Sequence, residues 1–383
     1  MSRWIWQQPD WPAFRWEEKA LLAPLSQARL KQGKLLGLRG LLDAGLSREA
    51  RAQILVEECS NTSAIEGERF DLDAIRSSVA RHLGLPTAGL PAPPRTVDGL
   101  VEVLLDATMG FGRSLTLERL CGWQAALFPT GYSGLYRLRA GELRGEEPMR
   151  VVSGAVGRER VHFEAPPRAG LGENLHRFLA WFADPPPDLD GLLRAGLAHL
   201  WFVTLHPFED GNGRLARAIT DMALCQDEGQ PARLFSLSAR IMRNREAYYA
   251  VLENTQRGDM DTTRWLAWFL AEVSAACDQS ETTVERVIAK ARFWLQHQNT
   301  ALNERQRKTL NRLLDVGAGG FEGGMNTRKY ASLNKISRAT AYRELADLSA
   351  KGCLAPIGEG RGARYELARP LAGTAPGGPN ERR

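Results

Sequence analysis

The sequence contains few cysteines, and they are not spaced for cross-linking or for metal binding. The five cysteines are scattered over positions 59, 121, 225, 277 and 353, and no CxxC pair occurs. A scattered and odd-numbered set predicts neither a disulfide framework nor a zinc site. This excludes the small disulfide-rich secreted proteins and favours a reducing, cytoplasmic location.

Long apolar runs are also absent. No stretch is long and apolar enough to span a bilayer, and the first nine residues lack the basic, apolar and small-residue regions of a signal peptide. The composition, with 43% hydrophobic and 25% charged residues, is typical of a water-soluble globular protein. We therefore expect no membrane partner, and 383 residues favour two or three domains.

The positive charge is confined to one end of the chain. Residues 301–383 carry 15 Lys and Arg against 8 Asp and Glu, a net charge of +7, whereas the first 300 residues carry a net charge of −2. The basic excess therefore needs its own explanation within the C-terminal region.

Hydrophobic periodicity predicts a mainly α protein with four segments. Residues 1–92 read as an N-terminal helical extension, 93–290 as a helical domain, 300–368 as a smaller module and 369–383 as a disordered tail. The extension begins with an aromatic-rich stretch, Trp4 to Trp16, which we interpret as a cap on the helical core. Its helices are expected at 17–42 and 47–66, the second with Ser47 as N-cap. A Pro/Gly-rich linker at 84–94 follows.

The helical domain is interrupted once. Residues 150–163 alternate β-branched and polar side chains around Gly154 and Gly157, and Pro166-Pro167 closes the segment. This pattern predicts a β-hairpin within an otherwise helical domain.

The run from His206 to Arg217, His-Pro-Phe-Glu-Asp-Gly-Asn-Gly-Arg-Leu-Ala-Arg, indicates a loop that enters a helix. Glycines at 211 and 213 leave the backbone N–H groups at the helix start accessible to a polyphosphate. Arg214 and Arg217 would lie on the first turn, where both can pair with phosphate oxygens. Asp210 is placed for Mg²⁺ and His206 for taking a proton from a hydroxyl. By spacing alone, a plain turn between two helices is an equal alternative.

This run resembles the Fic family motif HxFx(D/E)GNGRxxR at every specified position. The resemblance implies a Fic helical core, with the hairpin as its flap, that transfers AMP from ATP to a Ser, Thr or Tyr hydroxyl of a target protein and of the chain itself. His206 would be the general base, Asp210 the Mg²⁺ ligand and Phe208 the anchor of the loop. The other nucleotide-binding positions implied within the motif are Gly211, Asn212, Gly213, Arg214, Leu215, Ala216 and Arg217.

Two more segments resemble the family. In the hairpin, Val161, His162, Phe163 and Glu164 would face the nucleotide, although a plain exposed hairpin is the alternative. Residues 248–256 resemble the segment that contacts adenosine, which implies Tyr248 and Gln256 as further ATP-binding residues. An aromatic side chain on a helix is more often part of the core.

The run Thr62-Ser-Ala-Ile-Glu66-Gly67 resembles the family's inhibitory pattern (S/T)xxxE(G/N). The resemblance implies that Glu66 pairs with Arg217, takes the place of the γ-phosphate and misorients ATP. Glu66 could instead position a water that removes AMP from a modified target. Taken alone, a Glu followed by Gly is an ordinary end of a helix.

The C-terminal module has the outline of a winged helix-turn-helix. Helices are expected at 304–316, 327–333 and 337–351, and strands at 353–357 and 363–367. Such modules place the first polar residues of their third helix on DNA, and the module accounts for the net charge of +7. The candidate DNA-binding residues are Arg338, Thr340, Tyr342, Arg343 and, in the wing, Arg361. A docking or dimerisation module is the alternative. The oligomeric state, including a homodimer, is left open, as is the identity of the target protein.

Two functions of different classes follow from these observations. The first is a protein adenylyltransferase that uses ATP and Mg²⁺ and is inhibited by Glu66. The second is a DNA-binding regulator whose Fic core senses a nucleotide. The complete set of motif residues favours the enzyme, because a nucleotide sensor has no need of a base.

Overall fold

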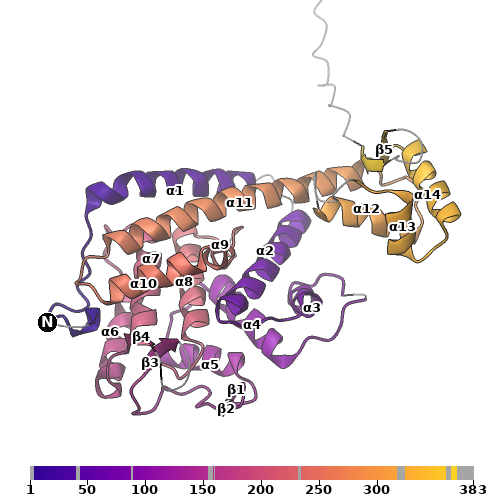
Figure 1. The fold of residues 1–383 in the computed structure, drawn as a ribbon. Coiled ribbons are helices and arrows are strands. Elements are labelled where there is room, and N and C mark those ends of the chain that lie inside the picture. The colour runs from indigo at the N-terminus through magenta and orange to yellow at the C-terminus, as the bar shows by residue number, and fades with distance from the viewer. Residues whose placement is uncertain are drawn as a thin grey trace, which may run out of the picture. The chain divides into compact units, whose positions relative to one another are not determined.

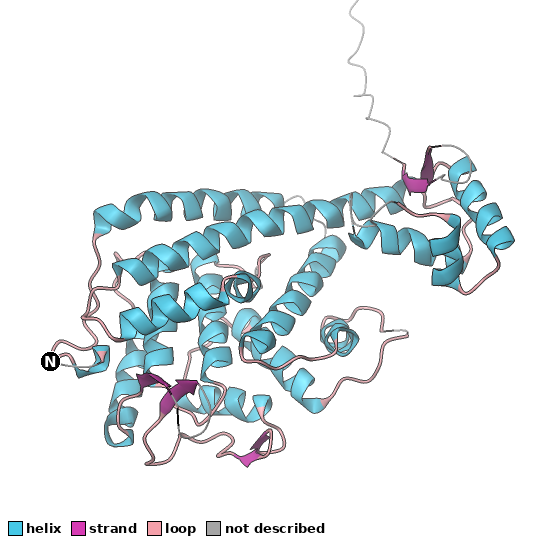
Figure 2. Cartoon of the chain, in the orientation of Figure 1, coloured by secondary structure: helices cyan, strands magenta, loops and turns pink. Residues whose placement is uncertain are grey.

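The computed structural model describes residues 4–39, 44–87, 89–153, 158, 160–231, 234–316, 324–358 and 364–368 (Figure 1). The chain divides into two compact units, Met1–Glu281 and Thr282–Arg383. The described residues are mainly helical, with three pairs of short strands, which confirms the expected fold class (Figure 2). None of the described helices is long and apolar enough to cross a membrane.

The helices of the first unit surround a central antiparallel pair. The unit contains α1 (Glu18–Arg39), α2 (Ala44–Ile65), α3 (Leu72–His82), α4 (Arg95–Met109), α5 (Leu117–Leu127), α6 (Leu171–Ala183), α7 (Gly191–Leu205), α8 (Asn212–Glu228), α9 (Leu237–Arg243), α10 (Arg245–Gln256) and, as far as Glu281, α11 (Thr263–Gln296), with single 3₁₀ turns η1 (Ile5–Gln7) and η2 (Arg168–Gly170). The central pair is α7 and α8. Because α7 is apolar around its whole circumference, it is buried from Leu192 to Leu205.

Two β-hairpins lie beside the end of α7 that carries the motif (Figure 1). Strand β1 (Tyr132–Ser133) pairs with β2 (Tyr136–Arg137), and β3 (Arg150–Ser153) pairs with β4 (Arg160–Glu164), both antiparallel. The second pair, called the flap below, confirms the expected hairpin. Gly154 and Gly157 lie outside the described residues.

One helix boundary differs from the expected one. Helix α2 begins at Ala44, so Ser47 lies inside the helix and is not its N-cap, because residues 44–46 before it are already helical. Helix α11 runs without a break from Thr263 to Gln296, because neither Gly nor Pro occurs between these residues to stop it. The short helix α9 was not expected from the sequence.

The N-terminal aromatic stretch packs on the first unit in two places, which confirms the expected hydrophobic cap. Trp4 is 2% exposed and lies edge-on to Phe163 of the flap, with 5.3 Å between ring centroids. Further along, the rings of Trp11 and Phe14 contact Trp201 of α7 at 6.3 and 5.7 Å.

The second unit contains the remaining short elements. After the end of α11 come α12 (Glu304–Val316), α13 (Thr327–Asn334), α14 (Arg338–Ala350) and the antiparallel strands β5 (Leu354–Ile357) and β6 (Arg364–Leu367). Its core is built from apolar side chains of all these elements, among them Leu310, Tyr330, Leu345 and Leu348. The order of elements agrees with the expected one, and the expected tail from Pro370 lies outside the described residues.

Candidate functional site

The motif residues form a rigid loop between α7 and α8. Helix α7 ends at His206, which adopts a left-handed backbone conformation with φ of 47°. The side chain of Asn212 closes the loop, because it accepts from the N–H of Phe208 at 3.0 Å and donates to the Phe208 carbonyl at 2.8 Å. Phe208 itself is fully buried. The loop therefore has little freedom to move relative to α8.

The glycines of the loop are required by their surroundings. Gly211 has φ of 88°, and a Cβ there would lie 3.0 Å from the ring of Phe128. At Gly213, in the first turn of α8, a Cβ would lie only 2.2 Å from Oε1 of Glu66. The Glu66 carboxylate thus lies directly against the amino end of α8, where the helix dipole and free N–H groups attract an anion.

His206 is arranged as a neutral base. Its Nδ1 lies 3.2 Å from the carbonyl oxygen of Val203. Because a carbonyl can only accept, the proton is on Nδ1, and Nε2 keeps its lone pair. Burial lowers the pKa of His206, as does the nearby cation Arg144, while the hydrogen bond to Val203 acts in the opposite direction. The imidazole is therefore able to accept a proton at neutral pH.

Arg217 is buried and is bonded from α2. Its Nε donates to Oγ1 of Thr62 at 2.7 Å, and its Nη2 donates to the Thr62 carbonyl at 3.0 Å and to Oε1 of Glu66 at 2.7 Å. The Arg217 side chain is 2% exposed and that of Glu66 30%. Among the described residues Nη1 of Arg217 has no hydrogen-bond partner although it is buried. A buried cationic donor that is not fully bonded is suited to an anionic ligand.

Arg214 is buried at the start of α8, whereas the neighbouring Asp210 is partly exposed. Nη1 of Arg214 pairs with Oε2 of Glu68 at 2.8 Å, and its guanidinium lies 4.9 Å from the centre of the Phe128 ring. Asp210 is 41% exposed and accepts from the hydroxyl of Ser133 at 2.6 Å. No group of three or more His, Cys, Asp or Glu side chains that could hold a metal occurs among the described residues. Asp210 thus offers one partly exposed carboxylate on the loop.

A cavity of about 520 Å³ lies between the loop, the flap and α10. Glu66, His206, Gly213, Tyr248 and Gln256 line it. Tyr248 and Gln256 are both buried and hydrogen-bonded, Tyr248 to Nε2 of His199 at 2.9 Å and Gln256 to Oγ1 of Thr204 at 3.1 Å. Another cavity of about 620 Å³, near Trp16 and Trp181, contains none of the motif residues.

The four flap residues expected at the nucleotide point in different directions. His162 and Phe163 line the cavity, whereas Val161 packs against the cluster of Trp4 and Phe163. Glu164 pairs with Arg150 at 2.8 Å on the exposed side of the strands. The motif residues Leu215 and Ala216 are fully buried in α8 and are part of the core next to the loop.

Four polar residues at the site were not expected from the sequence. They are Thr62, which binds Arg217; Ser133, which binds Asp210; His199, which binds Tyr248; and Glu253, which binds His162. Thr62 alone had a signal, since it is the Ser/Thr position of the inhibitory pattern. The others join segments from 49 to 91 residues apart and have no local sequence pattern.

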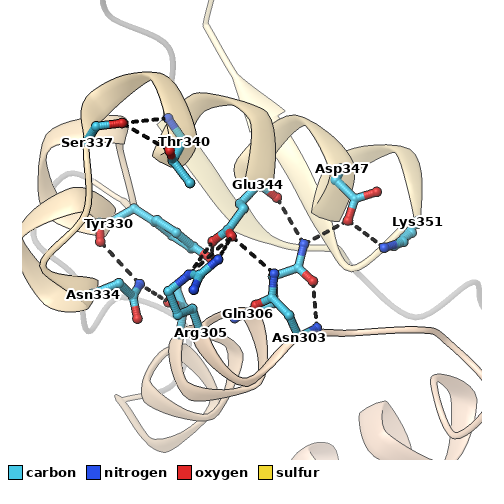
Figure 3. A network of polar contacts seen from close by, with 11 residues as sticks. Asn303, Arg305, Gln306, Tyr330, Asn334, Ser337, Thr340, Glu344, Asp347 and Lys351 are labelled. Atoms are coloured by element: carbon cyan, nitrogen blue, oxygen red, sulfur yellow. Dashed lines mark hydrogen bonds and ion pairs between the residues drawn. The ribbon is translucent and has the colours of Figure 1, made fainter.

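In the second unit, α14 turns its polar residues outward. Arg338, Tyr342 and Arg343 are exposed, Tyr342 to 62%, whereas Thr340 is half-buried and bonded to Ser337 at 3.0 Å. The opposite side is fixed by Glu344, which accepts from Tyr330 at 2.8 Å and pairs with Arg305 (Figure 3). Arg361 lies outside the described residues.

Comparisons with known proteins agree with this geometry. Residues 114–224 match the model of the Fic/DOC family, and residues 4–85 match a domain of unknown function, DUF4172. The chain is similar over its length to a Fic family protein of Desulfovibrio desulfuricans, with a TM-score of 0.52, 17% identity and coverage of 95% of this chain and 97% of that one. This likeness shows the fold. Residues 114–224 therefore form a Fic/DOC domain, as the motif resemblance implied.

The curated relatives are named as adenylyltransferases. The chain is 27% identical over 224 residues to Protein adenylyltransferase Fic of Culex quinquefasciatus, which covers 57% of this chain and 40% of the relative. It is 33% identical over 89 residues to Protein adenylyltransferase fic-1 of Caenorhabditis elegans, which covers 23% of this chain and 16% of the relative. The matches thus span less than half the length of these relatives.

Proposed function

We propose that this chain transfers AMP from ATP to a hydroxyl of a target protein and that Glu66 inhibits the transfer. One observation carries the proposal: the Glu66 carboxylate lies against Gly213 and binds Arg217, while Nη1 of Arg217 stays unpaired. A carboxylate in that place occupies an anion site. The anion that fits a glycine-lined helix start with a buried arginine is a phosphate.

The reaction follows from the positions of the loop residues. The incoming hydroxyl gives its proton to Nε2 of His206 while its oxygen forms a bond to the α-phosphorus. The bond between that phosphorus and the bridging oxygen breaks, and pyrophosphate leaves with the electron pair. The N–H groups at Gly211 and Gly213 and the guanidinium groups of Arg214 and Arg217 hold the phosphate oxygens.

The residues present fit a magnesium ion as ATP carries it. Mg²⁺ commonly takes one or two protein carboxylates and completes its octahedron with phosphates and waters, so Asp210 suffices. Asp210 and its partner Ser133 would hold the ion, which neutralises phosphate charge when it is bound. The absence of a larger acidic cluster among the described residues is consistent with this arrangement.

The test is the transfer of label from ATP labelled on its α-phosphate to proteins of a cell lysate. We expect little transfer by the wild type and at least tenfold more by Glu66→Gly, because the γ-phosphate can then reach Arg217. His206→Ala in the Glu66→Gly background should lose transfer to these proteins by about 10²-fold or more, since it removes the base. Glu68→Gly, which removes the partner of Arg214, is the matched control and should not release the inhibition.

Two results would change the proposal. If Glu66→Gly transfers no label while DNA binding responds to ATP, the chain is a nucleotide-sensing regulator. If Glu66→Gly loses the ability to remove AMP from a previously modified protein, Glu66 serves the reverse reaction.

We also propose that the second unit binds duplex DNA through α14. The observation in favour is that Arg338, Tyr342 and Arg343 share the exposed side of this helix, in the region that carries the net charge of +7. The affinity of the full chain for duplex DNA should fall linearly on a log–log plot against salt concentration, with a slope of about 0.9 per phosphate contact. Arg338→Ala and Arg343→Ala should reduce the slope, whereas Lys351→Ala, which removes a cation bonded to Asp347, should not. No retention of duplex DNA at low salt would contradict this proposal.

A further inference from the structure

A hydroxyl, an imidazole and a carboxylate form a continuous hydrogen-bonded chain on the flap. Oγ of Ser153, at the end of β3, lies 2.5 Å from Nε2 of His162 on β4. Nδ1 of His162 lies 2.7 Å from Oε2 of Glu253 on α10. The three residues come from three separate elements, and the order of groups is the one that activates a serine as a nucleophile.

An irregularity in the flap aims His162 at its partners. Val151 pairs with Phe163 and Val152 pairs with Val161, so the register shifts and His162 is left as the extra residue of β4. Val161 and Phe163 on either side of it pack toward Trp4. A bulge of this kind redirects one side chain, and here it lets His162 reach both Ser153 and α10.

Glu253 fixes which ring nitrogen of His162 carries the proton. Its carboxylate also binds Arg160 and Arg257, both at 3.1 Å. Partial burial disfavours the charged form, but the hydrogen bonds from His162 and Arg160 outweigh it and lower the pKa of Glu253. An ionised carboxylate can only accept, so Nδ1 of His162 carries a proton. Nε2 is then the acceptor for the hydroxyl of Ser153, whenever the imidazole is neutral.

The hydroxyl of Ser153 opens into the same cavity as the phosphate site. Ser153, His162 and Glu253 line the cavity of about 520 Å³ together with His206 and Gly213. Ser153 is exposed, and His162 is its hydrogen-bond partner among the described residues. An activated hydroxyl in this place faces the electrophile that the proposed function puts there, the α-phosphorus of ATP.

We propose that Ser153 is an acceptor for AMP within the chain and that His162 is its base. The inference rests on the proposed function and adds the residue at which self-modification occurs. Oγ of Ser153 forms a bond to the α-phosphorus, its proton passes to Nε2 of His162, and the bond to the bridging oxygen breaks as pyrophosphate leaves. The product is a phosphodiester that joins Oγ of Ser153 to the α-phosphorus of AMP. The nucleotide is then attached to the flap.

The test maps the adenylated residue by peptide mass spectrometry after incubation of the full-length Glu66→Gly chain with ATP and Mg²⁺. The dominant adenylated peptide should contain Ser153. Ser153→Ala in this background should remove that modification, and Ser153→Thr, which keeps a hydroxyl, should retain part of it. Ser332→Ala, at another exposed serine, is the matched control and should leave the modification of Ser153 unchanged.

Variants of the two partners test the relay. His162→Ala should slow the modification of Ser153 by about 10²-fold, the usual contribution of a general base. Glu253 acts through His162, so it is a positioning residue. Glu253→Ala should slow the same step, and Glu253→Asp should recover part of the rate. Arg160→Ala, which removes another partner of the Glu253 carboxylate, should leave the rate unchanged, whereas a purely structural contact predicts that it slows too.

The outcomes separate the two proposals. If Glu66→Gly incorporates adenylate at other residues and none at Ser153, or if His162→Ala leaves the rate at Ser153 unchanged, the inference is wrong and the proposed function stands. If Glu66→Gly incorporates no adenylate into itself or into any other protein, both are wrong.

Discussion

His199 shows how a single residue holds three helices around the motif loop together. It is 1% exposed and joins α7 to Thr220 of α8 at 3.0 Å and to Tyr248 of α10 at 2.9 Å. The hydroxyl of Thr220 donates to the carbonyl oxygen of Ala216 at 2.7 Å. Its oxygen therefore accepts from Nδ1 of His199. Nε2 then accepts from Tyr248, and the imidazole is neutral.

The neutral state of His199 predicts a specific pH dependence of stability. Burial, together with the charge of Arg217, lowers the pKa of His199 from 6.5 to about 3. Because the folded-state pKa lies below that of the unfolded chain, the unfolded chain binds the proton more readily. The contribution of His199 to stability is therefore complete above pH 6.5 and is lost as the pH falls from 6.5 toward 3.

The comparison of wild type with His199→Gln tests this effect. We expect the variant to unfold at lower urea concentration at pH 7. Glutamine leaves either Tyr248 or Thr220 without its hydrogen-bond partner, which costs about 1–3 kcal/mol of stability. Below pH 6.5 the difference in the free energy of unfolding between the two proteins should shrink. A difference that stays constant from pH 7 to pH 4.5 would mean that the neutral imidazole does not contribute as described.

At the scale of elements, helix α14 depends on a buried charge for its orientation. Glu344 is 9% exposed and binds Tyr330 of α13, Arg305 of α12 and Asn303 (Figure 3). It thus ties three segments of the second unit to one side of α14. The other side, with Arg338 and Arg343, is left exposed by the same arrangement.

Removal of this carboxylate should destabilise the second unit. Glu344→Ala leaves the buried hydroxyl of Tyr330 without its acceptor, at a cost of about 1–3 kcal/mol. Glu344→Gln keeps an acceptor for Tyr330 and should cost less. Unfolding in urea, followed by the fluorescence of Trp294 in a chain without the other tryptophans or by hydrogen exchange of α14, measures both. Equal stability of the three proteins would show that the network carries no net energy.

The elements also show which features a sequence can predict. The loop at 206–217 was foreseen because its contiguous pattern specifies its own backbone. The Glu66–Arg217 pair, 151 residues apart, was foreseen only because two separate runs resemble motifs of one family. The bulge at His162 was not foreseen, because a shift of one residue in strand register leaves no distinct sequence pattern. The contact of Trp4 with Phe163 was not foreseen either, because it joins segments far apart in the chain. Helix α9 was missed because seven residues are too few for a periodicity to be recognised.

At the scale of the whole molecule, the motif loop and the Glu66 side chain that contacts it belong to one compact unit. Helix α2 carries Thr62 and is followed by Glu66, and it packs against α8 and α9 of the same unit, so the Glu66–Arg217 contact is part of the fold of residues 1–281. Glu66 stands at the end of α2, followed by Gly67 with φ of 86°. A change confined to this helix end can therefore release the site while the rest of the unit stays folded.

The intact mass of the purified chain after incubation with ATP and Mg²⁺ tests the proposed inhibition by Glu66 most directly. We expect Glu66→Gly to gain the mass of one or more adenylate groups, with release of an equal amount of pyrophosphate, while the wild type keeps its mass. Failure of the folded Glu66→Gly chain to gain adenylate or to modify any other protein, or equal gains by the two proteins, would contradict it.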